Sequence, residues 1–266
     1  MTSGETHLLI VDPQEDFCNP HTGALYVPGA EQDMQRLAML IDRIGQRLSR
    51  IDVTLDSHHA LHIFHAIFWQ DPAGNPPPPF TTISNAEVEA GVWRTRWPHH
   101  SEIAAEYTRA LEAAQKYRLT IWPTHCLLGS RGSLVYAPLF QALQSWEILT
   151  GKSVVYRLKG ENPFTEHYSA IKAEVPMDDD PTTLPDGEWT TNLTDCDTLL
   201  LAGEALSHCF MSTVLDLADI HPNAVARFTV LTDATSPIPG FEQECTRFLT
   251  DIQARSAHVE VSTNLF

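Results

Sequence analysis

The chain has 266 residues, of which 43% are hydrophobic and 19% are charged, so it is long enough to bury a sizeable core. Its 34 acidic and 17 basic residues give a formal net charge of −17, which disfavours binding to nucleic acid or to anionic membranes. The five cysteines are odd in number and widely spaced, no secretory signal opens the chain, and no run nears the roughly 18 apolar residues of a membrane span, so we expect a cytoplasmic protein.

The first part of the chain alternates between strand patterns and helical periodicity. Residues 7–12 (HLLIVD) and 51–58 (IDVTLDSH) contain short apolar runs followed by aspartate, which predict buried parallel strands. Between them, residues 29–49 place apolar side chains at helical spacing. A strand, a helix and a second strand in this order predict a right-handed βαβ unit.

The middle of the chain interrupts this rhythm twice. Residues 70–100 contain the stretch DPAGNPPPPF, and residues 176–190 are acidic and rich in proline. Proline removes a backbone donor and fixes φ, so we expect both segments to be loop insertions within one domain that spans 1–266. The regular elements expected around them are helices over 101–116 and 135–148 and strands over 117–122 and 153–159.

The last third of the chain has the clearest pattern. The sequence predicts strands over 197–203, 227–235 and 258–262, and helices over 208–219 and 240–256. Strands that alternate with helices along the whole chain are typical of the α/β class. We therefore expect a single doubly wound, mostly parallel sheet with helices on both faces.

Ionisable and nucleophilic side chains gather where the predicted strands end. Binding sites in open α/β sheets lie at the carboxyl ends of the strands. The side chains that this sequence places there are Asp12, Asp56, His58, His125, Lys159 and Cys209. Six such side chains on one rim are more than the fold alone requires, so we treat them as a candidate site.

Cys209 is the candidate nucleophile because it begins a predicted helix. A helix N-terminus lowers the pKa of a thiol, and its free N–H groups can stabilise an oxyanion. A lone cysteine is more often a small hydrophobic core residue. Asp12 and Lys159 favour the catalytic interpretation, since a carboxylate can take the thiol proton and an ammonium can stabilise the thiolate.

The segment DSHHALHIFH (56–65) indicates a metal site. Asp56 and His58, with His62 or His65 nearby and His125 from a neighbouring strand, offer the oxygen and nitrogen ligands that suit zinc, iron or manganese. The alternative is that these histidines fill a polar crevice or a dimer surface.

Six motifs resemble, in order and rough spacing, those of the nicotinamidase/isochorismatase-like cysteine hydrolases. They are IVDPQEDFC (10–18), DSH (56–58), WPTHC (122–126), YRLKG (156–160), GEALSHC (203–209) and VLTDAT (230–235). They cover nearly the whole chain, and WPTHC is similar to the motif of nicotinamidases in particular. The resemblance implies an isochorismatase-like fold.

The resemblance also implies the roles of the matched residues. Cys209 would be the nucleophile, Asp12 the general base and acid, and Lys159 their electrostatic partner. The peptide between Glu204 and Ala205 would be cis and would help to form the oxyanion hole. The remaining implied residues are Asp56, His58, His125 and His62 as ligands of one divalent ion, zinc first and iron or manganese as alternatives, and Phe17, Trp122 and Tyr168 as walls around a flat ring.

The implied activity is the hydrolysis of nicotinamide to nicotinate and ammonia, a step of NAD salvage, by a homo-oligomer acting on a small-molecule amide. The chain departs from the family at Ser57, where an aromatic residue is usual, at Glu204, where an apolar residue is commoner, and in its two insertions. These departures leave open another small amide of the ureido, carbamoyl or maleamate type, and a non-catalytic, metal-stabilised binding module. They also leave His65 open as the fourth ligand.

Overall fold

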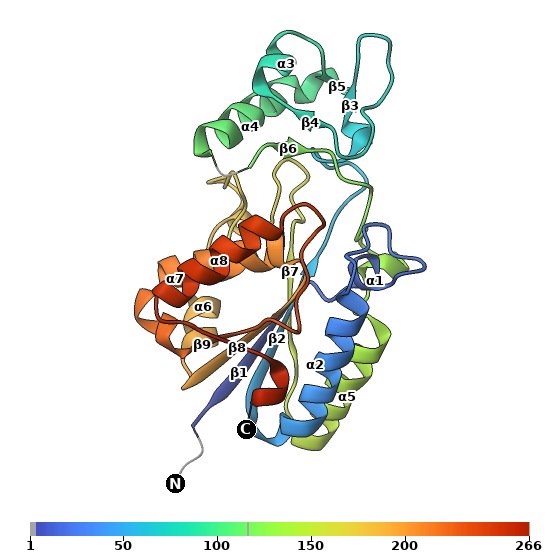
Figure 1. The fold of residues 1–266 in the computed structure, drawn as a ribbon. Coiled ribbons are helices and arrows are strands. Elements are labelled where there is room, and N and C mark those ends of the chain that lie inside the picture. Colours follow the sequence, from blue (N-terminus) through green and yellow to red (C-terminus); the bar gives the residue numbers. More distant parts are fainter. Residues whose placement is uncertain (1–3, 116, 266) are drawn as a thin grey trace.

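A six-stranded parallel sheet runs through the main body of the computed structural model, which describes residues 4–115 and 117–265 (Figure 1). The strands are β1 (Thr6–Val11), β2 (Leu48–Asp56), β7 (Val155–Lys159), β8 (Thr198–Gly203), β9 (Phe228–Leu231) and β10 (His258–Glu260). Their order is β10-β9-β8-β1-β2-β7, and neighbouring strands pair in parallel. The chain therefore winds outward in both directions from β1, which creates a switch point between β1 and β8.

Helices cover both faces of this sheet (Figure 1). On one side lie α2 (Ala30–Ile44) and α5 (Ala137–Thr150), and on the other lie α6 (Gly187–Thr194), α7 (Met211–Ile220) and α8 (Glu242–Ala254). Strand β1 serves both layers, because Leu8 and Ile10 pack with α2 and α5 whereas Leu9 and Val11 pack with α6, α7 and α8. The prediction of a doubly wound α/β fold is confirmed.

A small lobe above the sheet holds the first insertion (Figure 1). Its elements are β3 (Trp69–Gln70), β4 (Thr82–Ile83), α3 (Asn85–Glu89), β5 (Arg94–Thr95), α4 (Ser101–Ala114) and β6 (Leu119–Thr120). Strands β3 and β5 pair antiparallel, as do β4 and β6. A capping box, in which Ser84 and Glu87 bond to each other's backbone N–H, starts α3.

Two expectations for this lobe were wrong. Residues 70–100 are not all loop, because regular structure resumes at β4 after the proline-rich stretch. The strand expected over 117–122 shrinks to β6, which pairs with β4 outside the main sheet. Helix α4 agrees with its prediction, although residue 116, the expected helix end, lies outside the described residues, as do residues 1–3 and 266 of the expected domain.

Short helices fill many of the connections. The one that matters most for the site is η6 (Leu206–Phe210), a π-helical turn that leads from β8 into α7. The others are α1 (Glu15–Cys18), η1 (Gly45–Arg47), η2 (Ala66–Phe68), η3 (Pro98–His100), η4 (Arg131–Ser133), η5 (Pro181–Thr183), η7 (Pro222–Arg227) and η8 (Ser262–Asn264).

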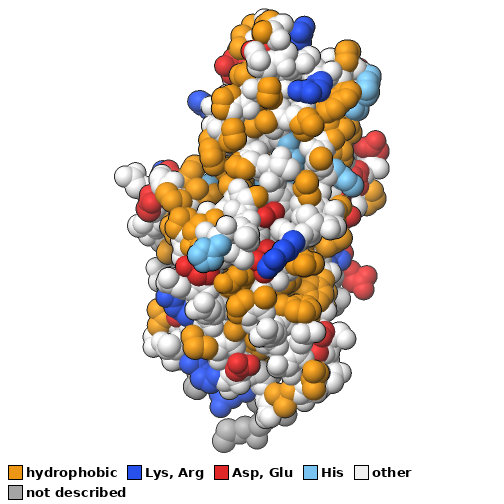
Figure 2. Space-filling model, turned by 90° about the vertical axis from the view of Figure 1, so that its right-hand side faces the viewer, with side chains coloured by type: hydrophobic (Ala, Val, Ile, Leu, Met, Phe, Trp, Pro, Cys, Tyr) orange, Lys and Arg blue, Asp and Glu red, His pale blue; other side chains and the backbone are white. Residues whose placement is uncertain are grey.

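The surface carries charges of both signs. Figure 2 shows Lys and Arg side chains on one face as separate spots among Asp, Glu and apolar residues, as expected for a chain with 34 acidic and 17 basic residues. Within the described ranges, no helix is both long enough and apolar enough to cross a bilayer.

Candidate active site

The register of the central strands brings the predicted catalytic residues together. Asp12 directly follows β1, and Asp56 and Lys159 are register partners at the ends of β2 and β7. On the other side of β1, Val11 is the register partner of Gly203, so the turn after β8 starts beside Asp12. Parallel pairing therefore places Asp12, Asp56, Lys159 and Cys209 at one buried edge of the sheet.

Lys159 is the centre of this group. Its Nζ lies 2.9 Å from Asp12 Oδ2 and 2.9 Å from Asp56 Oδ1, and it donates to the His167 carbonyl at 2.7 Å. The same Nζ lies 3.6 Å from Cys209 Sγ. One buried ammonium thus faces two carboxylates and a thiol, and these neighbours hold the pKa of Lys159 well above its usual range despite its burial.

The two aspartates next to Lys159 differ in the direction of their pKa shifts. Burial raises the pKa of Asp12, although Lys159 and Thr54 counteract this by stabilising its charged form. For Asp56 burial is outweighed by His58 and Lys159, which hold its pKa well below the usual range. Asp56 is therefore a permanent anion, whereas Asp12 is closer to the pKa at which a carboxyl can both take and return a proton.

The expectation of a lowered thiol pKa at Cys209 was wrong. Burial raises the pKa of Cys209 well above its ordinary value, and the nearby Lys159 charge only partly offsets this effect. The resting side chain is therefore a thiol rather than a thiolate. A nucleophile in this position needs a partner that removes its proton. The carboxylate of Asp12, which lies within 4.8 Å of the thiol, can do so, whereas the protonated Lys159 can only stabilise the thiolate.

The turn that carries Cys209 is fitted tightly against β1. Gly203 has φ +115°, and a Cβ there would lie 2.1 Å from the Val11 carbonyl oxygen, so only glycine is compatible with this approach. The Glu204–Ala205 peptide is cis, as the resemblance implies. Glu204 N donates to the Val11 carbonyl at 2.7 Å, which fixes the start of the turn.

Two residues of the opening motif connect these loops, a role that the sequence analysis missed. The Gln14 side chain accepts from Asp56 N and donates to the Asp56 carbonyl, each at 2.7 Å. Asp16 Oδ2 accepts from Cys126 N at 2.7 Å, so it anchors the WPTHC loop. The polar residues Gln14 and Asp16 directly after a buried strand could have predicted this role, because buried polar side chains need hydrogen-bond partners.

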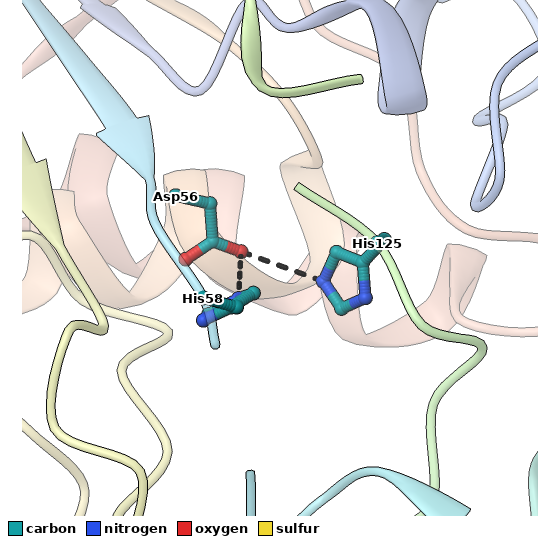
Figure 3. Close-up of side chains that lie close together, drawn as sticks. All are labelled: Asp56, His58 and His125. Atoms are coloured by element: carbon teal, nitrogen blue, oxygen red, sulfur yellow. Dashed lines mark ion pairs between the residues drawn. The ribbon is translucent and has the colours of Figure 1, made fainter. Parts of the chain in front are cut away.

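Asp56 also joins a cluster of histidines (Figure 3). Its Oδ2 lies 2.9 Å from His58 Nε2 and 3.5 Å from His125 Nε2. The Nδ1 atoms face backbone carbonyls, that of Gly160 at 3.1 Å from His58 and that of Pro123 at 2.7 Å from His125. An Nδ1–H that donates to a carbonyl leaves the Nε2 lone pair free, which is the usual arrangement of a metal-binding histidine.

The structure distinguishes between His62 and His65. His62 Nε2 faces the Gly160 carbonyl at 2.8 Å and its Nδ1 accepts from His59 N at 3.1 Å, so the backbone engages both nitrogens. His65 Nδ1 faces the Ala60 carbonyl at 3.1 Å, whereas its Nε2 is buried without a hydrogen-bond partner among the described residues. The His65 ring centroid lies 6.0 Å from that of His58 and 5.9 Å from that of His125.

These residues fit a divalent metal ion. Ligand atoms of Asp56, His58 and His125 lie within 4.8 Å of one another, and all three side chains are buried. One carboxylate with two or three neutral imidazoles is a donor set that suits zinc and also accommodates iron or manganese. Burial lowers the pKa values of His58 and His65, the latter to about 3, which keeps both rings neutral and able to bind a metal.

A pocket of about 400 Å³, its open mouth included, lies beside the thiol and the metal-binding group. The predicted aromatic walls line it, and Trp122 Nε1 donates to Tyr168 OH at 3.0 Å, which holds two of them together. Five further residues that the sequence did not single out also line it, namely Leu25, Val27, Glu166, His208 and Ile238. Its size and mostly apolar lining suit a small flat molecule.

Residues of the small lobe above the sheet support two side chains that line this pocket, Glu166 and Tyr168. Tyr107 OH, from α4, accepts from Glu166 N at 3.2 Å, and the Tyr117 ring lies 4.5 Å from that of Tyr168. Tyr117 OH and Ser212 Oγ are 2.7 Å apart. The lobe above the sheet is therefore part of the support for the pocket walls.

Comparison with known proteins identifies the fold. No protein-family model and no curated protein matches the chain. Among solved structures, yeast nicotinamidase Pnc1p is similar with a TM-score of 0.67 and 21% identity over 97% of this chain and 99% of that one. An Acinetobacter baumanii nicotinamidase/pyrazinamidase is similar with a TM-score of 0.63 and 20% identity over 98% of each chain.

A third similar structure is the pyrazinamidase of Pyrococcus horikoshii in complex with zinc, with a TM-score of 0.56 and 18% identity over 96% of this chain and 97% of that one. The yeast protein has also been solved bound to the inhibitor nicotinaldehyde. The chain therefore has the fold of nicotinamidases and pyrazinamidases, as its motifs predicted.

Proposed function

We propose that this protein is a cysteine amidohydrolase that holds one divalent metal ion and converts nicotinamide and water to nicotinate and ammonia. The observation that carries this proposal is the position of Lys159 Nζ, 2.9 Å from Asp12 and 3.6 Å from the Cys209 thiol, at the edge of an aromatic pocket. The fold is shared with nicotinamidases, which supports the reaction class.

In the first half of the reaction, the Asp12 carboxylate takes the proton of Cys209 while Lys159 stabilises the resulting thiolate. Sulfur attacks the carboxamide carbon, and the carbonyl oxygen becomes an oxyanion. We assign its stabilisation to the backbone N–H groups of Ala205 and Cys209. The intermediate collapses when the C–N bond breaks, and ammonia leaves with the proton that Asp12 returns.

The second half of the reaction releases the acid. Asp12 takes a proton from water, and the hydroxide attacks the thioester carbon of Cys209. The C–S bond then breaks and the sulfur recovers its proton from Asp12. The carboxylic acid so formed loses its remaining proton to solvent and leaves as nicotinate. One carboxyl therefore serves as base and acid twice in each turnover, which agrees with the raised pKa of Asp12.

We assign Asp56, His58 and His125 to the metal ion, with His65 rather than His62 as the fourth ligand. The ion supplies a coordination site for a heteroatom of the substrate, such as a pyridine nitrogen, and so favours an aromatic amide. The zinc in the Pyrococcus pyrazinamidase supports zinc as the first candidate, with iron or manganese as alternatives.

Phe17, Trp122 and Tyr168 orient the substrate ring in this proposal. All three line the pocket, and the edges and faces of such rings pack against a flat heterocycle at low entropic cost. The nicotinaldehyde bound by the yeast protein supports a pyridine carbonyl compound as the ligand class. We place the reaction in cytoplasmic NAD salvage and expect a homo-oligomer.

The decisive test is ammonia release from nicotinamide by the metal-loaded protein and by its Cys209→Ala variant. We expect release by the wild type and a loss of about a thousandfold or more in kcat in the variant, since Cys209 is the one cysteine among the described residues that line the pocket. Ammonia release that survives the substitution contradicts the role of Cys209. A wild type that contains metal but does not hydrolyse nicotinamide points instead to a ureido, carbamoyl or maleamate-type amide.

A further inference from the structure

Glu204 is a buried carboxyl group that the proposed reaction does not use. It immediately precedes Ala205, which lines the pocket together with Cys209. Its side chain is completely buried, and its Oε2 accepts a hydrogen bond from Ser236 N at 3.1 Å. Its Oε1 has no donor within reach among the described residues, which is costly for a carboxylate and acceptable for an acid that donates.

Asp33 of α2 is the carboxyl group next to Glu204, and Ser236 bridges the two, because its N donates to Glu204 Oε2 and its Oγ to Asp33 Oδ2. The two carboxyl groups lie within hydrogen-bond reach of each other. Asp33 already receives two donors, Arg36 Nη1 at 2.9 Å and Ser236 Oγ at 2.5 Å. Because these donors stabilise charge on Asp33, Asp33 is the anion of the pair and Glu204 carries the shared proton.

The other ionisable groups around the pair do not favour ionisation of Glu204. Glu31 of α2 is a further acid near Glu204. Cys18 of α1 is a buried thiol whose pKa a negative charge on Glu204 would raise. Asp233, after β9, is an acid that faces Asp33. Burial and the neighbouring acids raise the pKa of Glu204 well above its ordinary value, in agreement with the geometry.

We propose that Glu204 is a positioning residue that, as a neutral carboxylic acid, ties the turn carrying Ala205 and Cys209 to α2. The same turn is bonded to the loop after β9 at several points, since Gly203 N donates to Ala234 O at 2.9 Å and Leu206 N to Ser236 O at 2.9 Å. The Glu204 carboxyl extends this contact across Ser236 to Asp33. One side chain therefore connects the nucleophile turn both to the loop after β9 and to helix α2.

Loss of the proton from Glu204 reverses this effect. Two carboxylates within hydrogen-bond reach repel each other in a site that excludes water. The turn then loses its connection to α2, and the positions of Ala205 and Cys209 become less defined. The effect on catalysis rests on the proposed function, whereas the protonation of Glu204 does not.

The protonation is tested first, without any substrate, by urea unfolding of the wild type and of Glu204→Gln between pH 5 and 9. The unfolded wild type releases the Glu204 proton near its ordinary pKa of 4.5, whereas the native state retains it. The unfolding constant of the wild type should therefore rise, relative to Glu204→Gln, by about tenfold per pH unit until the native carboxyl ionises.

Glu106→Gln, at an exposed position of α4, controls for the loss of one negative charge and should show no such divergence. Asp33→Asn should shorten the pH range of the effect, because it removes the negative charge that keeps Glu204 protonated. Parallel pH profiles for the wild type and Glu204→Gln would show that Glu204 is ionised in the native state, and would overturn the proposal.

The positioning role is tested by turnover of nicotinamide. Glu204→Ala should lower kcat by about tenfold or more with a smaller change in KM, and Glu204→Gln, which keeps a donor, should recover most of that loss at pH 7. The alkaline decrease in kcat should be smaller in Glu204→Gln than in the wild type. A Glu204→Ala variant with wild-type kcat overturns the positioning role. A wild type that is inactive towards nicotinamide, with divergent unfolding profiles, contradicts the proposed function and leaves the protonation of Glu204 supported.

Discussion

At the scale of single residues, one buried cation accounts for most of the site. Two carboxylates and a thiol at the end of a parallel sheet would repel one another if they were all ionised, and Lys159 removes that repulsion by contacting all three. The two aspartates share Lys159 but differ in pKa, because Asp56 has His58 as an additional partner. Asp56 is thus suited to bind a cation and Asp12 to move a proton.

His208 gives the clearest pH dependence at this scale. Burial lowers its pKa from 6.5 to about 4, so the native state binds fewer protons than the unfolded state between these values. The contribution of neutral His208 to the free energy of unfolding is fully present above pH 6.5. It should decrease by about 1.4 kcal/mol per pH unit as the pH falls to about 4. His208→Asn removes this titration while keeping an acceptor for Ser207 Oγ, which lies 2.8 Å from Nδ1.

Urea unfolding of the wild type and His208→Asn at pH 4 to 8 measures this difference. The other buried histidines are common to both proteins and cancel in the comparison. Equal acid sensitivity of the two proteins would mean that His208 is not held neutral by burial.

At the scale of elements, the loops at the carboxyl end of the sheet position one another. The loop after β7 approaches the metal-binding group so closely that Gly160, with φ +79°, has no room for a side chain. A Cβ there would lie 2.7 Å from His58 Cε1 and 3.0 Å from its Nδ1. The Gly160 carbonyl also faces His58 Nδ1, so one residue both orients the ring and limits its position.

Gly160→Ala should therefore weaken metal binding, by about tenfold or more, because the new methyl group displaces His58. Gly151→Ala is the matched control, since Gly151 has φ +67° and open space around it. Both variants should lose about 1–2 kcal/mol of stability from the left-handed backbone. The bound metal per chain, measured after dialysis, should fall only in Gly160→Ala, and a similar loss in Gly151→Ala would indicate a backbone effect instead.

At the scale of the whole molecule, two parts of the chain that are far apart in sequence must meet to complete the pocket. The small lobe above the sheet supports two of the lining residues through Tyr107 and Tyr117, and the loop after β9 supplies Ile238. The side chains that could hold a metal ion come from two further segments, Asp56 and His58 from one and His125 from the other. Ligand binding should consequently stabilise the fold as a whole.

Removal of the ion by a chelator should lower the thermal midpoint, and addition of zinc should restore it. A ligand that binds only the native state at 100 times its Kd contributes about 2.7 kcal/mol. Asp56→Ala should respond to neither treatment and should raise KM more than it lowers kcat, because the ion orients the substrate. Unchanged metal content in Asp56→Ala would remove Asp56 from the ligand set.

Much of the sheet could be predicted from the sequence, because β1, β8 and β9 are apolar runs whose residues are almost all buried. The segment before His125 shows the limit of this reasoning. It has a strand pattern, yet it forms the two-residue β6 outside the main sheet. The WPTHC loop is held instead by the bond from Cys126 N to Asp16 and by backbone bonds to the segment 58–65. Local pattern does not reveal which partner a short apolar segment will pair with.

The sequence by itself determined the fold class, the order of the strands along the chain and the set of side chains at their carboxyl ends, because periodicity and chain order are local properties. The tertiary structure alone decided three points. Burial raises the pKa of Cys209 where a helix N-terminus would lower it. The Gly160 carbonyl faces His62 Nε2, whereas His65 Nε2 has no hydrogen-bond partner among the described residues, and Ser236 brings Glu204 next to Asp33. Each of these points depends on desolvation or on a contact between distant segments. Desolvation and such contacts cannot be read from any single stretch of the chain.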